Sequence, residues 1–537
     1  MDKSVLKNFI YLCILILLIK VIIRPDYIPD DCAVHYEAGF RLIHGQIPYI
    51  DFIETNLPMI FYINAIPAWL SETFHGPAYP VFSLFNIFML ASIFIFCNII
   101  INQAKDAGKE YRYLLSGLGL FYVFTSGLIG QREFIITLFF LPYLFLEAFR
   151  FDHKTIIPIQ AVLVGFLAGV AIAIKPNYGL ILIGYELVWC LKTQNLKKCF
   201  TLENISLMVT LILYLIHFLL LPSVESKELF GNFIPLLVYG YKAFDIALGD
   251  LILTLCYGWT SSPSLTPVPF LFVIPLSLVL LWGIFLRKKF LIIDPLMAWL
   301  IAGIVVYLWQ AKGFSTHTLL MLQGYYALAI IEIYFVTNWF INNIAFLKRI
   351  QFKFISFSEV LFLILLLMLS PSMLRYGDSL TVNQLLKNTI NKYCKPQDYI
   401  MVLSGRTDSF PNIYGCRLGT RYLSIFVPES LFAYIKDHPC KYFSCHDIEK
   451  QEALMMSNLI EDLNKYQPTL IAIENTTGKY NMATYFKKLG FINYCLKHNY
   501  FELNTKNSTD KFIVRQDPFF GNFYLTNDYL LFVKTAK

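Results

Sequence analysis

The run VLKNFIYLCILILLIKVII, residues 5–23, sets the class of fold to which this chain belongs. It is almost entirely apolar, and its length matches the roughly 20 residues that a helix needs to cross the hydrocarbon core of a bilayer. The run is too long for the apolar region of a signal peptide, and no small-residue cleavage site follows it. We therefore interpret it as the first membrane helix of the chain.

Comparable apolar runs recur through most of the sequence. Of the 537 residues, 57% are hydrophobic and 15% are charged, whereas a soluble globular domain carries about 25% charged residues. The pattern predicts an α-helical polytopic protein of the inner (plasma) membrane. We expect eleven spans, at residues 5–23, 81–101, 113–128, 134–149, 156–174, 178–191, 205–221, 268–286, 291–308, 319–340 and 355–374.

Basic residues set the expected orientation of these spans. Alternate loops carry clustered Lys and Arg, and such clusters favour the cytoplasmic side of a membrane. We therefore expect a cytoplasmic N-terminus, with the first loop, residues 24–79, and the tail after residue 374 on the outer side. The net charge of +7 is explained by these loops and needs no nucleic acid as a partner. The clusters are Lys3 and Lys7; Lys105, Lys109 and Arg112; Arg150 and Lys154; Lys192, Lys197 and Lys198; Arg287, Lys288 and Lys289; and Lys348, Arg349 and Lys353.

The composition changes after residue 374, which predicts a transmembrane domain at residues 1–374 and an extracytoplasmic domain at residues 375–537. In this outer domain, the strand-like runs Tyr399–Leu403 and Thr469–Ile473 each follow a proline and a polar, helix-like stretch. Strands that alternate with helices predict a small α/β domain.

Five cysteines lie in the outer domain. Two of them stand with two histidines in the segment His438-Pro439-Cys440-Lys441-Tyr442-Phe443-Ser444-Cys445-His446. Such a group could bind zinc, but a disulfide is the commoner use of cysteines in an oxidising compartment, and an ordinary loop is a third interpretation. Because the number is odd, at least one thiol would be left unpaired within the domain. The five are Cys394, Cys416, Cys440, Cys445 and Cys495.

The first outer loop holds the densest group of polar residues on the outer side. Its segments Asp31–Leu42 and Pro58–Leu70 have apolar residues at helical spacing, which predicts two amphipathic helices. Carboxylates held between these helices could supply a general base and its partner. The alternatives are an ordinary acidic loop, or a helix N-cap at the first acidic pair. The candidates are Asp30, Asp31 and Glu54 for catalysis, with Tyr49, Asp51 and Asn56 in support.

The other outer ends of the spans each carry a cation. Charged groups near lipid are costly unless they are paired or face a wet cavity. Three cations at one depth could converge on a phosphate or pyrophosphate, which Arg and Lys bind well. The alternative is that each side chain reaches the interface separately. The cations are Arg132, Lys175 and Lys312, and Glu133 and His317 stand beside them in sequence as supporting residues.

These features together resemble a known superfamily. One N-terminal span, the acidic pair Asp30-Asp31 and an amphipathic helix precede the stretch Pro48-Tyr49-Ile50-Asp51-Phe52-Ile53-Glu54-Thr55-Asn56-Leu57-Pro58. This order resembles the GT-C membrane glycosyltransferases, in particular protein O-mannosyltransferases and the aminoarabinose transferase of lipid A. The segments Gly130-Gln131-Arg132-Glu133 and Lys175-Pro176 are also similar to that superfamily.

The resemblance implies a polyprenyl-phosphate sugar as donor, an extracytoplasmic glycan, lipid or protein as acceptor, and a site on the outer side. Asp30 matches the acid that acts as catalytic base, and Asp31 stands where Glu is usual. Glu54 matches the acid before the proline of a second motif. Asn56 stands where many relatives have a lysine that contacts the donor phosphate, so Arg132, Lys175 or Lys312 would have to supply that contact.

Several alternatives stay open at this point. Asp30, Asp31 and Glu54 could also ligate a divalent metal, because carboxylate oxygens suit such ions and related enzymes differ in metal use. A transporter or flippase of a lipid-linked saccharide would also need cations and a wet cavity, but it favours broken helices in two repeated halves. A non-catalytic membrane scaffold would leave the acidic residues of the first loop unexplained.

Overall fold

The computed structural model describes most of the chain in two compact units. Unit 1 comprises Met1–Pro25, Ser83–His217 and Ile246–Asp378, and unit 2 comprises Asp26–Phe82, Phe218–Asp245 and Ser379–Lys537. The residues described are 3–23, 28–103, 108–152, 156–242, 244–256, 280–286, 291–313, 315–343, 384–404, 415–437, 444–477, 480–503 and 529–534.

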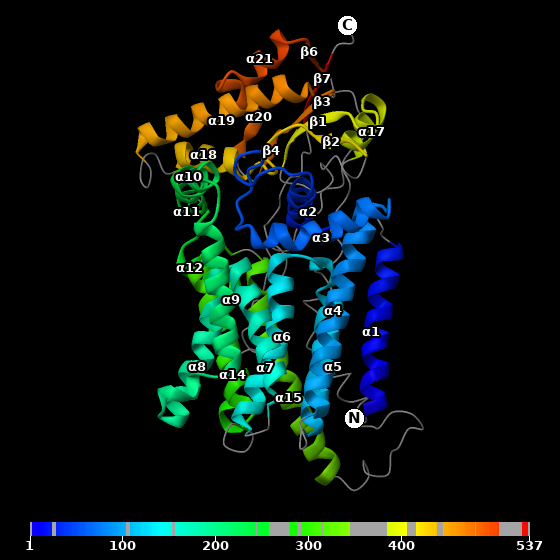
Figure 1. Cartoon of the computed structure of the whole chain (residues 1–537), viewed down its shortest axis with the longest axis vertical. Helices are drawn as coiled ribbons and strands as arrows, with labels where there is room; N and C mark the ends of the chain where they lie inside the picture. Colours follow the sequence, from blue (N-terminus) through cyan, green and yellow to red (C-terminus); the bar gives the residue numbers. More distant parts are fainter. Residues whose placement is uncertain are drawn as a thin grey trace. The chain divides into compact units, whose positions relative to one another are not determined.

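Unit 1 is a bundle of apolar helices (Figure 1). Helix α6 is buried along its whole apolar length and packs against α7, α14 and α15. Helix α7 begins with Pro158, whose fixed φ and missing N–H suit the first turn of a helix. The helices are α1 (Lys3–Ile23), α4 (Ala78–Gln103, which begins in unit 2), α5 (Lys109–Phe124), α6 (Arg132–Phe151), α7 (Pro158–Ile174), α8 (Leu180–Thr193), α9 (Leu202–Leu219), α12 (Leu248–Cys256), α14 (Ile293–Gln310) and α15 (Leu319–Asn343).

Five described helices are long and apolar enough to cross a membrane. They are Ala78–Gln103, Arg132–Phe151, Leu202–Leu219, Ile293–Gln310 and Thr316–Val336, and the shorter apolar helices Phe9–Ile23 and Pro158–Ile174 accompany them. Nine of the expected spans coincide with helices of unit 1. The expected span at 355–374 lies outside the described residues, as does most of that at 268–286, so the total of eleven stays a prediction.

Unit 2 contains both amphipathic helices expected in the first loop, α2 (Asp30–Ile43) and α3 (Met59–Thr73). The two helices pack closely because Gly39 of α2 lies against the backbone of Asn64, where an added Cβ would stand 2.4 Å from the carbonyl carbon. The unit also holds α10 (Ser223–Lys227), the π-helix η4 (Glu228–Phe233) and α11 (Ile234–Lys242).

The tail of unit 2 forms the small α/β fold that the sequence predicts. Its five-stranded sheet has the order β2-β1-β3-β7-β6, in which β1 pairs in parallel with β2 and β3, and β7 runs antiparallel to β3 and β6. The strands are β1 (Tyr399–Leu403), β2 (Arg417–Leu418), β3 (Leu470–Glu474), β6 (Tyr500–Glu502) and β7 (Tyr529–Lys534), and β4 (Thr476–Thr477) pairs separately with β5 (Tyr480–Asn481). The helices are α17 (Gln384–Tyr393), α18 (Phe426–Asp437), α19 (Cys445–Tyr466), α20 (Met482–Lys488) and α21 (Phe491–Lys497).

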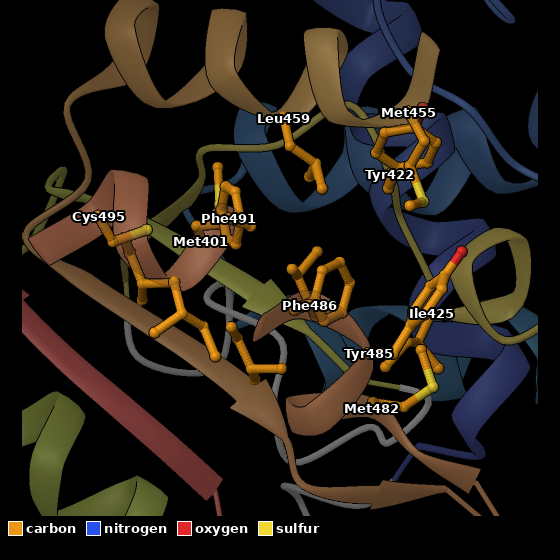
Figure 2. Close-up of a cluster of buried hydrophobic side chains, with 14 of the residues drawn as sticks. Met401, Tyr422, Ile425, Met455, Leu459, Met482, Tyr485, Phe486, Phe491 and Cys495 are labelled. Atoms are coloured by element: carbon orange, nitrogen blue, oxygen red, sulfur yellow. The ribbon is translucent and has the colours of Figure 1, made fainter. Parts of the chain in front are cut away.

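Apolar side chains from this sheet and its helices form one core (Figure 2). Met401 of β1, Leu459 of α19 and Phe486 of α20 are fully buried in it. Helix α19 is fixed at its start by Ser444, whose hydroxyl accepts a hydrogen bond from the Asp447 N–H at 3.1 Å. Such a cap satisfies a backbone donor that the helix itself leaves open.

A segment of the first loop pairs with the tail inside unit 2. Ile53 donates its N–H to the Arg421 carbonyl at 2.6 Å, and its own carbonyl accepts from the Leu423 N–H at 3.2 Å. These bonds form a short parallel bridge between Ile53 and Tyr422. The boundary expected after residue 374 lies outside the described residues, but the bridge groups the first loop structurally with the tail.

Candidate functional site

Three polar residues from distant parts of the sequence meet in unit 1. Glu133 stands in the first turn of α6, Lys175 follows the end of α7, and His317 lies in the 3-10 turn η5 (Ser315–Thr318) before α15. The Lys175 ammonium lies 2.8 Å from Glu133 Oε1 and 3.0 Å from His317 Nε2. Glu133 is fully buried and His317 nearly so, which makes the ion pair far less screened than one at a surface.

The local chain geometry explains why these groups can meet. Gln131 caps α6 with extended backbone, so Arg132 and Glu133 occupy its first two positions, where the helix dipole favours the carboxylate. Lys175 leaves α7 with φ −150° and ψ 98°, which breaks the helix before Pro176. Because the charged ammonium can only donate, His317 Nε2 acts as the acceptor, which places the imidazole proton on Nδ1.

Cations outnumber carboxylates around His317. The charges of Lys175, Arg132 and Lys312 all act on its ring, and Glu133 is the carboxylate that acts with them. Lys312 lies in the connection between α14 and η5, beside two residues with left-handed backbone, Ala311 and Gly313. The structure therefore brings Lys175, Glu133 and His317 into direct contact and places the charges of Arg132 and Lys312 within their electrostatic reach.

The first acidic pair lies at the start of α2 in unit 2. Pro29 is the N-cap residue and its carbonyl accepts the Cys32 N–H at 2.9 Å, so Asp30 and Asp31 occupy the first two helical positions. Neither aspartate is the N-cap residue, because Pro29 occupies that position and α2 begins at Asp30, one residue before the expected start. At these positions a carboxylate is stabilised in its charged form by the helix dipole. The Asp30 side chain itself lies outside what the structure describes.

Glu54 and Asn56 form a buried polar cluster with His35 of α2. Asn56 donates to Glu54 Oε1 through its amide nitrogen, which also lies 3.0 Å from His35 Nε2. The Thr55 hydroxyl donates to the same Glu54 oxygen at 3.1 Å. Asn56 thus binds the carboxylate directly.

The two remaining residues of the first-loop prediction shape its backbone. Tyr49 has a positive φ of 65° and donates its hydroxyl to the Asn56 carbonyl at 2.8 Å. Asp51 accepts the Ile47 N–H at 2.8 Å and so closes the turn between these positions. Both contacts hold the segment that leads to Glu54, which is a positioning role in the loop.

Sequence reasoning assigned no role to Arg41, which the structure shows to be the main tie between α2 and the tail. Its guanidinium is buried, pairs with Glu37 at 3.0 Å, and donates to the carbonyls of Leu418 and Thr420, both at 2.8 Å. The spacing of four residues between Glu37 and Arg41 on an amphipathic helix was a signal for the pair. No feature of the sequence indicated the carbonyl partners, which lie more than 370 residues away.

Metal ligation by the first-loop acids receives no support from the described residues, among which no group of three His, Cys, Asp or Glu side chains is arranged to hold an ion. The metal alternative for Asp30 nevertheless stays open, since its side chain is not among them. In the tail, residues 438–443 of the His438–His446 segment also lie outside the described ranges, so neither zinc nor a disulfide is tested there.

No family model and no curated protein matches this chain. Among solved structures, it is similar to the crystal structure of the Archaeoglobus fulgidus oligosaccharyltransferase in the apo form, with 10% sequence identity and a TM-score of 0.35. The match covers 88% of this chain and 70% of that one.

Proposed function

We propose that the chain is a membrane glycosyltransferase that moves a sugar from a polyprenyl-phosphate donor to an extracytoplasmic acceptor. The proposal combines the apolar helices of unit 1, the polar clusters of both units and the sequence resemblance to GT-C enzymes. It includes an N-terminus in the cytoplasm and a tail on the outer side, as the basic loops predict.

The contact of Glu133, Lys175 and His317 is the observation that carries the proposal. These residues come from three separate connections, 42 and 142 positions from Lys175, yet meet at the ends of apolar helices. With Arg132 and Lys312 also acting on the ring of His317, the described residues place three cations and one carboxylate around it. Such a surplus favours an anion, and the phosphate of a lipid-linked sugar has the required charge. A phosphate gains charge as it leaves, so these cations would stabilise the transition state more than the ground state.

The acidic pair at the start of α2 supplies the base in this mechanism. Asp30 accepts the proton of the acceptor hydroxyl while the acceptor oxygen forms a bond to the anomeric carbon. The bond from that carbon to the phosphate oxygen breaks at the same time, and the lipid phosphate leaves with the electron pair. A single displacement of this kind inverts the anomeric configuration. Asp31 and Glu54 support the charge and the position of the acceptor.

Substitution of Asp30 by Asn tests this assignment. The change keeps the side-chain shape but removes the proton acceptor, so transfer should fall by about a hundredfold or more while donor binding persists. The measurement is consumption of radiolabelled polyprenyl-phosphate sugars by membranes that contain the full chain, with donor binding followed separately. Glu72→Gln is the matched control, because Glu72 lies in α3 of the same loop and pairs on the surface with His44.

Near-normal transfer by a well-folded Asp30→Asn variant would move the base to Asp31 or Glu54. Donor that is bound and carried across the membrane by the wild-type chain, with its sugar–phosphate bond intact, would instead favour a flippase.

A further inference from the structure

We propose that Cys394 and Cys416 form a disulfide that fastens the tail segment bound by Arg41. The two residues lie in unit 2, one at the end of α17 and the other directly before β2. Neither cysteine is in a disulfide in the structure, and the Cys416 Sγ lies 3.8 Å from the carbonyl oxygen of Lys395, the residue that directly follows Cys394. The inference rests on the outward location of the tail in the proposed function, because a disulfide persists in an oxidising compartment.

The backbone holds both cysteines in place independently of their thiols. Cys394 ends α17 with its N–H on the Ile390 carbonyl at 2.8 Å, and Ile390 is buried. Two further bonds join the strands that follow, from the Gln397 N–H to the Gly415 carbonyl at 2.9 Å and from the Arg417 N–H to the Asp398 carbonyl at 2.8 Å. These bonds hold the two cysteines in adjacent segments of the chain, as a disulfide between them requires.

The chemistry requires an oxidant that carries an exchangeable disulfide. One cysteine thiolate attacks a sulfur of that oxidant and releases its first thiol, and the other cysteine then displaces the second thiol to leave the Cys394–Cys416 bond. Two protons and two electrons pass from the pair to the oxidant. The hydrogen bond from Cys394 lowers the pKa of the Cys416 thiol, which supplies the thiolate that starts such an exchange.

The position of Cys416 places the proposed disulfide beside the tail segment that contacts α2. Cys416 immediately precedes β2, and the carbonyls of Leu418 and Thr420, one and three residues beyond Arg417, accept the two bonds from Arg41. The parallel bridge between Ile53 and Tyr422 lies next along the same segment. A disulfide at Cys416 therefore stiffens the stretch of tail that positions α2 and the approach to Glu54.

Mass spectrometry of the full chain tests the bond. Cells are lysed in acid to trap thiols, free thiols are alkylated, and trypsin cleavage after Arg406 separates the peptides 393–406 and 407–417. We expect these two peptides to be linked before reduction and separate after it. The link should disappear in both Cys394→Ser and Cys416→Ser. Cys495, fully buried in the tail core, is the control thiol that should be alkylated and unlinked both before and after reduction (Figure 2).

A second measurement uses the purified full chain in detergent with oxidised and reduced glutathione. Oxidation should raise the thermal midpoint of the wild-type tail by roughly 5–10 °C and leave that of Cys394→Ser unchanged. Absence of the link in cells and in the purified chain overturns the proposed geometry. A link that forms only in the purified chain overturns the outward location of the tail, whereas donor consumption in the Asp30 experiment tests the transferase separately. Linkage of either cysteine to Cys440 or Cys445 also contradicts the pairing.

Discussion

The two ends of α6 carry buried charge clusters of opposite balance. At its start, Glu133 meets Lys175 and the charge of Arg132, and Lys312 acts on the neighbouring His317. At its end, Arg150 meets the carboxylates of Glu147, Glu186 and Glu203, at 3.0 Å and 2.8 Å for the first two and in direct contact with the third. One helix thus has a surplus of positive charge at one end and of negative charge at the other.

The two clusters differ in the sign of the charge that surrounds the buried ion pair. Both terminal nitrogens of Arg150 donate hydrogen bonds within its cluster. One binds Glu186, and the other binds Glu203 and the Thr201 hydroxyl. Tyr143 and Asn204 add bonds to the same carboxylate of Glu186, so the cluster joins α6, α8 and α9. Such a network is a structural tie that joins three helices, whereas among the described residues three cations and one carboxylate act on His317. Burial alone therefore does not distinguish the two clusters, but the sign of the surrounding charge does.

Removal of the Lys175 ammonium should give the largest effect on sugar transfer. Lys175→Met takes away a cation of the proposed phosphate site, and we expect donor-dependent transfer to fall by about a hundredfold or more. It also leaves the buried Glu133 carboxylate without that cation, which costs about 3–5 kcal/mol of stability. Transfer is measured as donor consumption per folded molecule in membranes.

The double variant Lys175→Met with Glu133→Gln separates the two effects. It removes the buried charge together with its partner, so folding should recover while transfer stays low. If the double variant transfers sugar at nearly the wild-type rate, the pair is structural, and the contrast between the two ends of α6 disappears.

Arg150 should behave in the opposite way. Arg150→Met leaves three carboxylates without their shared cation, and we expect a loss of about 3–5 kcal/mol of stability, measured as a lower thermal midpoint and a smaller folded yield. Addition of Glu147→Gln and Glu203→Gln should recover part of this loss. Transfer per folded molecule should stay within about twofold of wild type. A specific loss of transfer in the rescued variant would place function at this end as well.

The sequence predicted the elements of the fold better than their pairing. Apolar periodicity located nine helices and both amphipathic segments because burial against lipid or protein imposes a local pattern. The same apolar pattern ended the expected span at residue 149, and so predicted that Arg150 is one of the basic loop residues that orient the spans. In the structure Arg150 is buried and paired with three carboxylates, which no local pattern reveals because Glu186 and Glu203 lie 36 and 53 residues away.

The candidate site was predictable to a similar extent. Lys175, Glu133 and His317 could be predicted as candidates from the sequence, because each is a polar residue that interrupts an apolar run at the end of a span. The contact of Asn56 with Glu54 was not foreseen, because Asn56 was considered only as a replacement for a phosphate-binding lysine. Side-chain partners depend on how distant segments pack, and a single sequence does not contain that information in local form.

Arg41 is an intermediate case in this comparison, because its buried guanidinium binds three backbone carbonyls as well as one carboxylate. Arg41→Lys keeps the charge but cannot reach Glu37, Leu418 and Thr420 together, so we expect a loss of about 1.5–3 kcal/mol in stability, measured by thermal unfolding. Arg41→Met should lose more, because it leaves Glu37 unpaired as well. Equal stability of the lysine and wild-type chains would show that the carbonyl contacts contribute nothing.

Glu429 extends the comparison to a carboxylate beside another carboxylate, where the expected effect depends on pH. Burial, with the charge of Glu474, raises the pKa of Glu429 in α18 to about 8, from 4.5 in an unfolded chain. The folded tail therefore holds this proton more tightly than the unfolded tail, so its contribution to stability is complete below about pH 4.5 and declines as the pH rises to about 8. Glu429→Gln should flatten this decline in thermal midpoint. The same slope in Glu429→Gln and wild type between pH 5 and 8 would assign the pH dependence to another group.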